Sequence, residues 1–366
     1  MAYAYSIRYS SLIFSLVASF MTQSIELNIL CWEGYAVRKH IQSFQSIVEK
    51  KHNLRVRISV QDVSDPQEFF DGIRSRKADI ISPAHNIPKS HRWPMIQSNI
   101  VLPIDLKHVP NYQKLIPALK LNRFVGQDEK VYGIPIVYGY YGLVYNKSLV
   151  KKPPDSWKVL WDRRNKYQFT VSADYHEANI YAVALSLGYV RNEIFNYDLI
   201  MQNKLLRERT NAMAKFAKSL WVGVDKPDDL RGLKYGVVWG FALNALKEQG
   251  EEWAFAAPKE GATGWVDHWL IGYSLANDPI KKMIAEEWIN YTLSEEVQLF
   301  YHQHLGQQPV VNHLGRSSEN IQKTIPTIND DKFVENELIL WEILSRREQN
   351  GFIGLWNQAI KKRESE

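Results

Sequence analysis

Short apolar segments alternate with longer amphipathic segments through the first third of the chain. The short segments have the length of strands, and the longer ones repeat apolar residues at helical spacing. In chain order, the predicted strand, helix, strand, helix and strand are residues 27–30, 37–51, 56–60, 65–76 and 78–82. This order predicts a parallel sheet covered by helices, in which ligands bind beyond the carboxyl ends of the strands.

A second series of elements follows the segment Tyr132-Gly133-Ile134-Pro135. Strands are predicted at residues 138–145, 169–172 and 237–239, and helices at residues 179–187, in the stretch that ends at Gln249, and at residues 285–291. Residues that break regular structure, Pro258, Gly261 and Gly264, precede Trp265-Val266-Asp267. A chain of 366 residues is longer than one hydrophobic core usually supports, so we expect two lobes.

The first residues predict export. Arg8 precedes an apolar segment at residues 11–20, and small or polar residues follow it, which is typical of a secretory signal peptide cleaved between Ser19 and Ser24. The segment is too short to span a bilayer. The residue before Cys31 is not the small one that a lipoprotein anchor needs, so release into the periplasm is predicted. The alternative is an amphipathic N-terminal helix that a cytosolic protein retains.

Composition and charge exclude several classes of protein. The net charge of +5 is spread along the chain rather than gathered in a stripe, which argues against nucleic-acid binding. The single cysteine, Cys31, rules out an internal disulfide, and we expect it to be a small buried hydrophobe. No cluster has the spacing of a metal site and no catalytic motif is present, so neither a cofactor nor an enzyme is predicted.

Aromatic and acidic residues gather at the predicted strand ends. They are Trp32, Tyr35, Asp174, Glu177, Trp239, Trp265 and Asp267. A carboxylate can pair with the ammonium group of an amine, and an aromatic face adds about 0.5–2 kcal/mol of binding free energy. Micromolar binding needs roughly 8 kcal/mol, so several such groups must converge on the ligand. Each has a structural alternative, because Asp174 and Glu177 fit a helix capping box and the Trp residues could belong to the core.

Ordered motifs along the chain carry a resemblance to a known family. They are Trp32-Glu33-Gly34-Tyr35, Ala78-Asp79-Ile80-Ile81-Ser82-Pro83, Tyr132-Gly133-Ile134-Pro135, Ser156-Trp157 with Leu160-Trp161-Asp162, Asp174-x-x-Glu177, Val238-Trp239, and Pro258-Lys259-Glu260-Gly261 leading to Trp265-Val266-Asp267. The last motif is the most specific. Through these motifs, and over almost its whole mature length, the chain resembles the periplasmic spermidine/putrescine-binding proteins of ABC transporters.

The resemblance implies an α/β, two-lobed periplasmic-binding-protein-like fold of type II. Each lobe would hold a mixed sheet flanked by helices, and hinge crossovers would join the lobes. Residues 1–24 are the predicted signal peptide. The N-terminal lobe is predicted from residues 25–137 plus 263–308, and the C-terminal lobe from residues 138–262 plus 309–366. A monomer is expected.

The resemblance also implies a ligand site in the cleft between the lobes. Its aromatic walls would be Trp32, Tyr35, Trp239 and Trp265, and its amine-pairing carboxylates Asp174, Glu177 and Asp267. The chain departs from the family pattern at Glu33, Gly34, Ala84, Asn86 and Gln307, while Glu342 aligns loosely with a polar contact residue. We expect the residues at these five departures to set the length of the ligand, and four of them to line the site, namely Glu33, Ala84, Asn86 and Gln307.

Three functions remain open at this point. The first is capture of a polyamine, such as spermidine or putrescine, for import by a membrane ABC permease. The second is a polyamine sensor that docks on a membrane signalling receptor when liganded. The third is a binder of another cationic or zwitterionic amine. The binding step is the same for import and for sensing, so the sequence does not separate those two functions, and the residues that depart from the family pattern permit a different amine.

Overall fold

The computed structural model describes residues 24–120, 122–312, 314 and 338–365. The predicted signal peptide, apart from Ser24, lies outside these residues. The strands are β1 (Ser24–Cys31), β2 (Arg55–Asp62), β3 (Ile80–Ile81), β4 (Val101–Leu102), β5 (Gly126–Gln127), β6 (Lys130–Val131), β7 (Gly133–Asn146), β8 (Phe169–Ser172), β9 (Ser219–Trp221), β10 (Tyr235–Val238), β11 (Trp253–Phe255), β12 (Ala262–Gly272), β13 (Gln308–Pro309) and β14 (Leu338–Leu340). The helices are α1 (Arg38–His52), α2 (Pro66–Arg74), α3 (Asn122–Val125), α4 (His176–Ser186), α5 (Tyr197–Gln202), α6 (Lys204–Phe216), α7 (Pro227–Leu230), α8 (Ala242–Glu248), α9 (Pro279–Thr292), α10 (Glu295–Leu305) and α13 (Arg346–Glu364).

Twelve of these strands form one mixed sheet, and β5 and β6 form a separate pair. The path through the large sheet is β2-β1-β3-β12-β7-β10-β8-β9, with β4, β11, β13 and β14 paired to β12 or β7. β1 is parallel to β2 and β3, and β8 is parallel to β9 and β10. Parallel neighbours need long crossover connections, which helices supply here. The mixed sheet with flanking helices confirms the predicted α/β class.

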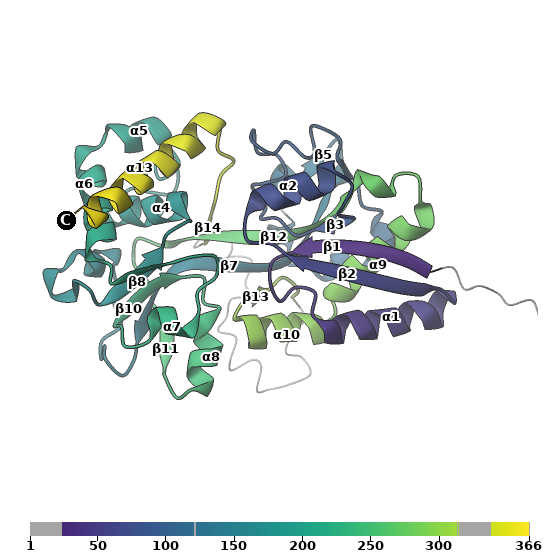
Figure 1. Ribbon diagram of the computed structural model, residues 1–366, viewed down its shortest axis with the longest axis horizontal. Coiled ribbons are helices and arrows are strands. Elements are labelled where there is room, and N and C mark those ends of the chain that lie inside the picture. Colours follow the sequence, from purple (N-terminus) through teal and green to yellow (C-terminus); the bar gives the residue numbers. More distant parts are fainter. Residues whose placement is uncertain (1–23, 121, 313, 315–337, 366) are drawn as a thin grey trace, which may run out of the picture.

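Two long antiparallel strands, β7 and β12, cross the middle of the molecule (Figure 1). β7 begins at Gly133, inside the Tyr132-Gly133-Ile134-Pro135 motif, and pairs with β12 as far as Tyr141. From Gly142 to Tyr145 the same strand pairs with β10. It therefore connects the end of the molecule that carries β1, α1, α2 and α9 to the end that carries β8, α4, α6 and α13 (Figure 1).

The starts of two helices show where local sequence decides structure and where it does not. Asp65 accepts a hydrogen bond from the Gln67 N–H, and Glu68 completes a capping box in the first turn of α2. At α4 the structural alternative for Asp174 and Glu177, a capping box, does not form, because the helix begins after Tyr175, which provides no side-chain cap. The Asp174 side chain is used elsewhere, as described below.

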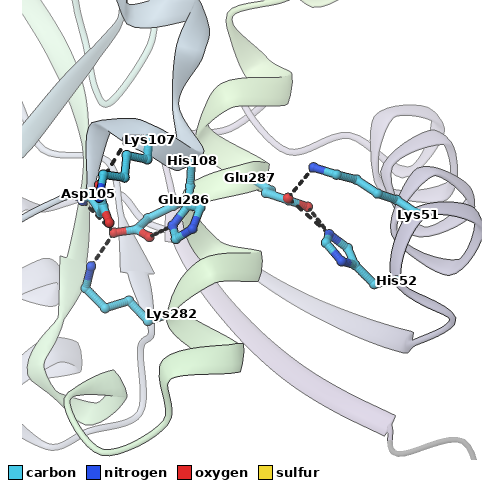
Figure 2. Close-up of polar contacts among 8 residues, drawn as sticks. All are labelled: Lys51, His52, Asp105, Lys107, His108, Lys282, Glu286 and Glu287. Atoms are coloured by element: carbon cyan, nitrogen blue, oxygen red, sulfur yellow. Dashed lines mark hydrogen bonds and ion pairs between the residues drawn. The ribbon is translucent and has the colours of Figure 1, made fainter.

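Two adjacent glutamates of α9 fix neighbouring elements (Figure 2). Buried Glu286 accepts hydrogen bonds from the Asp105 N–H at 2.7 Å and from Nδ1 of His108 at 2.6 Å. Glu287 instead contacts the last two residues of α1, at 2.6 and 2.9 Å. Because adjacent helical residues project in different directions, the pair holds α9 against two different segments at once.

Most buried apolar side chains form one continuous core that reaches from β1 to α13, and a smaller core lies around α2 and β3. Cys31 is fully buried, and burial raises the pKa of its thiol, which confirms it as a small core hydrophobe. In the part of the chain that the structure describes, no helix has the length and the apolarity needed to cross a membrane.

Candidate ligand-binding site

A cavity of about 60 Å³ is walled almost entirely by aromatic side chains. Its lining residues are Trp32, Tyr35, Ala84, Tyr175, Val224, Trp239, Phe241, Trp265, Asp267 and Trp341. Seven of these ten are aromatic, and only Asp267 is a carboxylate. The cavity is thus an aromatic cage with a single acidic group in its wall.

Most of the lining residues follow the carboxyl ends of strands. Trp32 and Tyr35 follow β1, and Trp239 follows β10. This agrees with the expectation that ligands bind beyond such ends. Trp265 and Asp267 differ from the prediction, because they lie inside β12 rather than at a strand end. The register of β12 against β7 shifts directly after Asp267, and such a bulge changes the direction in which a side chain points.

Asp267 is the electrostatic centre of the cavity. Its side chain is buried, and its Oδ2 accepts a hydrogen bond from the Tyr35 hydroxyl at 2.7 Å. Burial raises the pKa of Asp267 well above its ordinary range, although the bond from Tyr35 acts in the opposite direction. Among residues 24–120, 122–312, 314 and 338–365, no Lys, Arg or His forms an ion pair with it. The ionised form of Asp267 therefore has no cationic side chain beside it among the described residues, and an incoming cation would pair with it.

Trp239 is the centre of the aromatic wall. Its ring lies 4.5 Å from Tyr175, 5.7 Å from Trp341 and 6.2 Å from Trp265, with interplanar angles of 83°, 66° and 84°. Edge-to-face pairs of this kind contribute about 0.5–1.5 kcal/mol each. A Cβ on Gly139 would lie 2.8 Å from the Trp265 ring, so a glycine is needed where this indole lies across β7.

A second buried carboxylate, Asp225, fixes the backbone that carries Trp239. Its Oδ1 accepts hydrogen bonds from the N–H groups of Trp239 at 2.9 Å and Gly240 at 3.2 Å. Its Oδ2 accepts from the Ala242 N–H at 2.9 Å. Burial raises the pKa of Asp225 to about 6, against the effect of these bonds. The sequence analysis did not find Asp225, because nothing in its local pattern relates it to a tryptophan 14 residues later.

Replacing Asp225 by Ala is expected to destabilise the fold and to weaken ligand binding together. Three N–H groups would lose their acceptor, and each buried donor left without one costs about 1–3 kcal/mol. Urea unfolding followed by Trp fluorescence is expected to show a loss of about 3 kcal/mol or more. The matched control is Asp228→Ala, since the Asp228 side chain is 87% exposed and a surface pair is worth about 0–1 kcal/mol. Equal unfolding midpoints for the two variants would contradict this role.

The other two predicted carboxylates do not line the cavity. Asp174 is held by the Ser172 hydroxyl at 2.6 Å and by the Gly223 N–H at 2.9 Å, one bond to each oxygen. Glu177 is half-buried in the first turn of α4, and burial raises its pKa. Burial raises the pKa of Tyr175, and Asp174, Asp267 and Glu177 add to this effect. All three carboxylates are thus within electrostatic reach of the Tyr175 ring, but only one of them reaches the cavity.

Three further predicted site residues also lie outside the cavity lining. Glu33 is exposed. In the turn after β1, the side chains that line the cavity are those of Trp32 and Tyr35. Asn86 is half-buried, and its Nδ2 donates to the backbone carbonyl of Glu342 at 3.5 Å. Gln307 is buried and donates to a neighbouring backbone carbonyl. The predicted residues that do line the cavity are Trp32, Tyr35, Ala84, Trp239, Trp265 and Asp267.

Four lining residues were not predicted, namely Tyr175, Val224, Phe241 and Trp341. Tyr175 and Phe241 lie within two residues of predicted positions, so the strand-end argument could have included them. Val224 and Trp341 follow β9 and β14, two strands of three residues each. The apolar pattern did not predict these strands, so it offered no signal for the residues after them.

A larger crevice of about 370 Å³ has a different character. Leu338 and Glu342 line it, whereas Trp341 lines the smaller cavity, as expected where successive side chains of an extended segment alternate. Glu342 pairs there with Arg123 at 2.9 Å, and Arg191 donates to the Leu338 carbonyl at 3.0 Å. Glu342 and Arg191 thus already have partners in the larger crevice, whereas Asp267 has no cationic partner among the described residues. The smaller cavity is therefore the better candidate for a ligand site. Nowhere in the described residues do three or more potential metal ligands gather.

Solved structures share the fold. The spermidine/putrescine ABC transporter substrate-binding protein of Streptococcus pneumoniae has a TM-score of 0.69 at 18% identity, over 93% of this chain and 99% of that one. The Tp0655 lipoprotein of Treponema pallidum has a TM-score of 0.68 at 16% identity, over 91% and 99%. A periplasmic thiamin binding protein has a TM-score of 0.58 at 14% identity, over 92% and 96%. These similarities confirm the predicted type II periplasmic-binding-protein fold.

A family model gives a closer assignment than the fold. The model of the bacterial extracellular solute-binding protein family matches residues 75–336, which is more than half of the chain. The matched range includes Asp225, Trp239, Trp265 and Asp267, which form or support much of the cavity wall. The chain belongs to the bacterial extracellular solute-binding proteins, a family that binds solutes and is not enzymatic.

Proposed function

We propose that this protein is exported by residues 1–24, captures a small organic amine in the aromatic cavity, and delivers it to a membrane ABC permease. The observation that carries the proposal is Asp267, a buried carboxylate in an aromatic wall with no cationic partner among the described residues. Burial disfavours the ionised form of Asp267, and a cation that enters the cavity offsets the cost of ionising it. The chemistry of the site therefore favours a cationic ligand.

The aromatic walls support the same class of ligand. A cation over an aromatic face gains about 0.5–2 kcal/mol, most strongly over Trp, and Trp32, Trp239, Trp265 and Trp341 all line the cavity. A hydrogen bond to a charged group adds about 1.5–3 kcal/mol. Several such contacts together approach the roughly 8 kcal/mol of micromolar binding. An anion or a sugar supplies no positive charge to pair with the Asp267 carboxylate.

The proposed lobes are residues 25–137 plus 263–308 and residues 138–262 plus 309–366. On this division, Trp32 and Tyr35 come from the first lobe, and Tyr175 and Trp239 come from the second. A ligand that touches both sets stabilises the closed arrangement of the lobes, which a permease can then distinguish from the open one.

A polyamine is the amine that the sequence resemblance favours, and the related S. pneumoniae protein is named for spermidine and putrescine. Another related protein is named for thiamin, so the same fold serves ligands of different shape. The proposal therefore rests on the amine class, which the buried carboxylate and the aromatic walls support directly.

A thermal-shift screen of the mature protein against amines, amino acids, sugars and inorganic anions tests this function. A ligand that binds the folded state alone stabilises it by about 2.7 kcal/mol at 100 times its Kd, and calorimetry then gives the affinity. We expect amines to raise the melting temperature. A screen in which a sugar or an anion does so and no amine does would overturn the proposal.

A further inference from the structure

We infer that the cavity holds one ammonium group, so that the ligand is a compact monocation rather than a diamine or a triamine. The inference rests on the proposed capture of an amine and narrows it. Of the ten lining residues, only Asp267 is a carboxylate. A diamine needs a partner for its second charge, because an unpaired ammonium in an apolar cavity is costly.

The nearby carboxylates do not supply that partner. Asp174 accepts one hydrogen bond on each oxygen, and Asp225 already accepts three backbone N–H groups. Neither residue lines the cavity, and nor does Glu177. The Tyr175 ring lines the cavity and lies within electrostatic reach of both Asp174 and Glu177. An ammonium group paired with Asp267 is therefore separated from these carboxylates by an aromatic wall.

The size and the shape of the cavity also favour a compact ligand with one positive charge. Its volume of about 60 Å³ is far below the ~300–1,000 Å³ of pockets that enclose larger organic ligands. The rings of Tyr175 and Trp265 stand at 83° and 84° to Trp239, so the walls meet nearly at right angles. Aromatic walls arranged around one point suit a compact, alkyl-substituted ammonium, which such cages recognise through its spread positive charge.

The test compares n-butylamine with putrescine, which has the same four-carbon chain and one more ammonium group, by calorimetry on the mature protein. Tetramethylammonium is the compact probe and spermidine the long one. We expect n-butylamine and tetramethylammonium to bind at least about tenfold more tightly than putrescine or spermidine, since the second charge loses its hydration without gaining a partner.

A matched pair of variants tests the reason for this preference. Val224 lines the cavity and is only half-buried, so a polar side chain can be placed there without disturbing the core. Val224→Asp adds a second carboxylate, and Val224→Asn adds a polar group of the same shape without the charge. Val224→Asp is expected to raise the affinity for putrescine relative to n-butylamine by about tenfold, and Val224→Asn is expected to leave the ratio unchanged.

The outcomes separate this inference from the proposed function. If putrescine or spermidine binds the wild-type protein as tightly as n-butylamine or more tightly, the single-ammonium inference is wrong and amine capture stands. The same holds if Val224→Asp leaves the ratio unchanged. If none of the four amines binds, amine capture itself fails.

Discussion

An Asp267→Asn variant is expected to lose amine binding and to melt at a higher temperature than the wild-type protein when no ligand is present. Truncating one member of a buried charge pair costs about 2–5 kcal/mol, which predicts a loss of affinity of at least about 30-fold. The change in stability has the opposite sign. Burial raises the pKa of Asp267, so its contribution to folding is fully present at low pH and is lost as pH rises through the raised pKa. Asn avoids that loss and keeps an oxygen that can accept the bond from Tyr35.

Calorimetry and thermal melts at pH 7.5 measure both effects, with Glu33→Gln as the matched control. Glu33→Gln removes one carboxylate charge, as Asp267→Asn does, but Glu33 is exposed in the turn after β1 and does not line the cavity. We expect its amine affinity and its melting temperature to match those of the wild-type protein. Unchanged affinity in Asp267→Asn would exclude Asp267 as the partner of the cation, and equal losses in both variants would indicate an effect of net charge alone.

The elements that could be predicted from the sequence are those whose apolar pattern is long or whose caps are local. The helix predicted at residues 37–51 is α1, and the strand predicted at residues 169–172 is β8 to the residue. Asp65 and Glu68 form their capping box because both partners are within three residues. Asp174 and Glu177 have the same spacing, but Asp174 instead receives a bond from Gly223, which only the folded chain brings near.

The site could be predicted only in part, for a related reason. Strand ends and the family resemblance identified Trp32, Tyr35, Trp239 and Asp267, since each belongs to a recognisable motif. The bond between Tyr35 and Asp267 joins residues 232 positions apart, and no spacing rule can show that contact. Glu33 and Tyr35 belong to one motif, yet only Tyr35 lines the cavity, because the turn after β1 exposes the Glu33 side chain. The motif therefore predicted that the turn after β1 belongs to the site, but only the folded structure shows which of its side chains line the cavity.

The hydrogen bonds of two buried acids near the cavity, Asp225 and Asp267, explain why the cavity can hold a charge. Asp225 is saturated with backbone donors and supports Trp239 from behind, so it is a structural group. Asp267 has one hydrogen bond, from Tyr35, and faces the cavity. Both carboxylates are buried, but Asp225 accepts three hydrogen bonds and Asp267 accepts one. Only Asp267 therefore has acceptor capacity left for a ligand.

The affinity for amines is expected to rise steeply with pH, by up to about tenfold per pH unit below the raised pKa of Asp267. In the ligand-free protein, burial favours the neutral acid, whereas the cation pairs with the carboxylate. Binding below the raised pKa must therefore release a proton, and affinity falls as the proton becomes harder to remove. Tyr35, which donates to Asp267, and Tyr175, which lies within its electrostatic reach, both have pKa values raised by burial, so neither supplies a competing charge in this range.

Tetramethylammonium is the probe for this measurement, because its charge does not titrate. Calorimetry between pH 5.5 and 7.5, repeated in buffers of different ionisation enthalpy, gives the affinity and the number of protons released per ligand bound. We expect release of up to one proton, and none from any Asp267→Asn protein that retains residual binding. Burial raises the pKa of Asp225 to about 6, but both of its oxygens are already bonded in the ligand-free fold, so we expect the released proton to come from Asp267 and not from Asp225. An affinity that is constant across this range, with no proton released, would mean that Asp267 is already ionised before the cation arrives, and the argument from burial would be wrong.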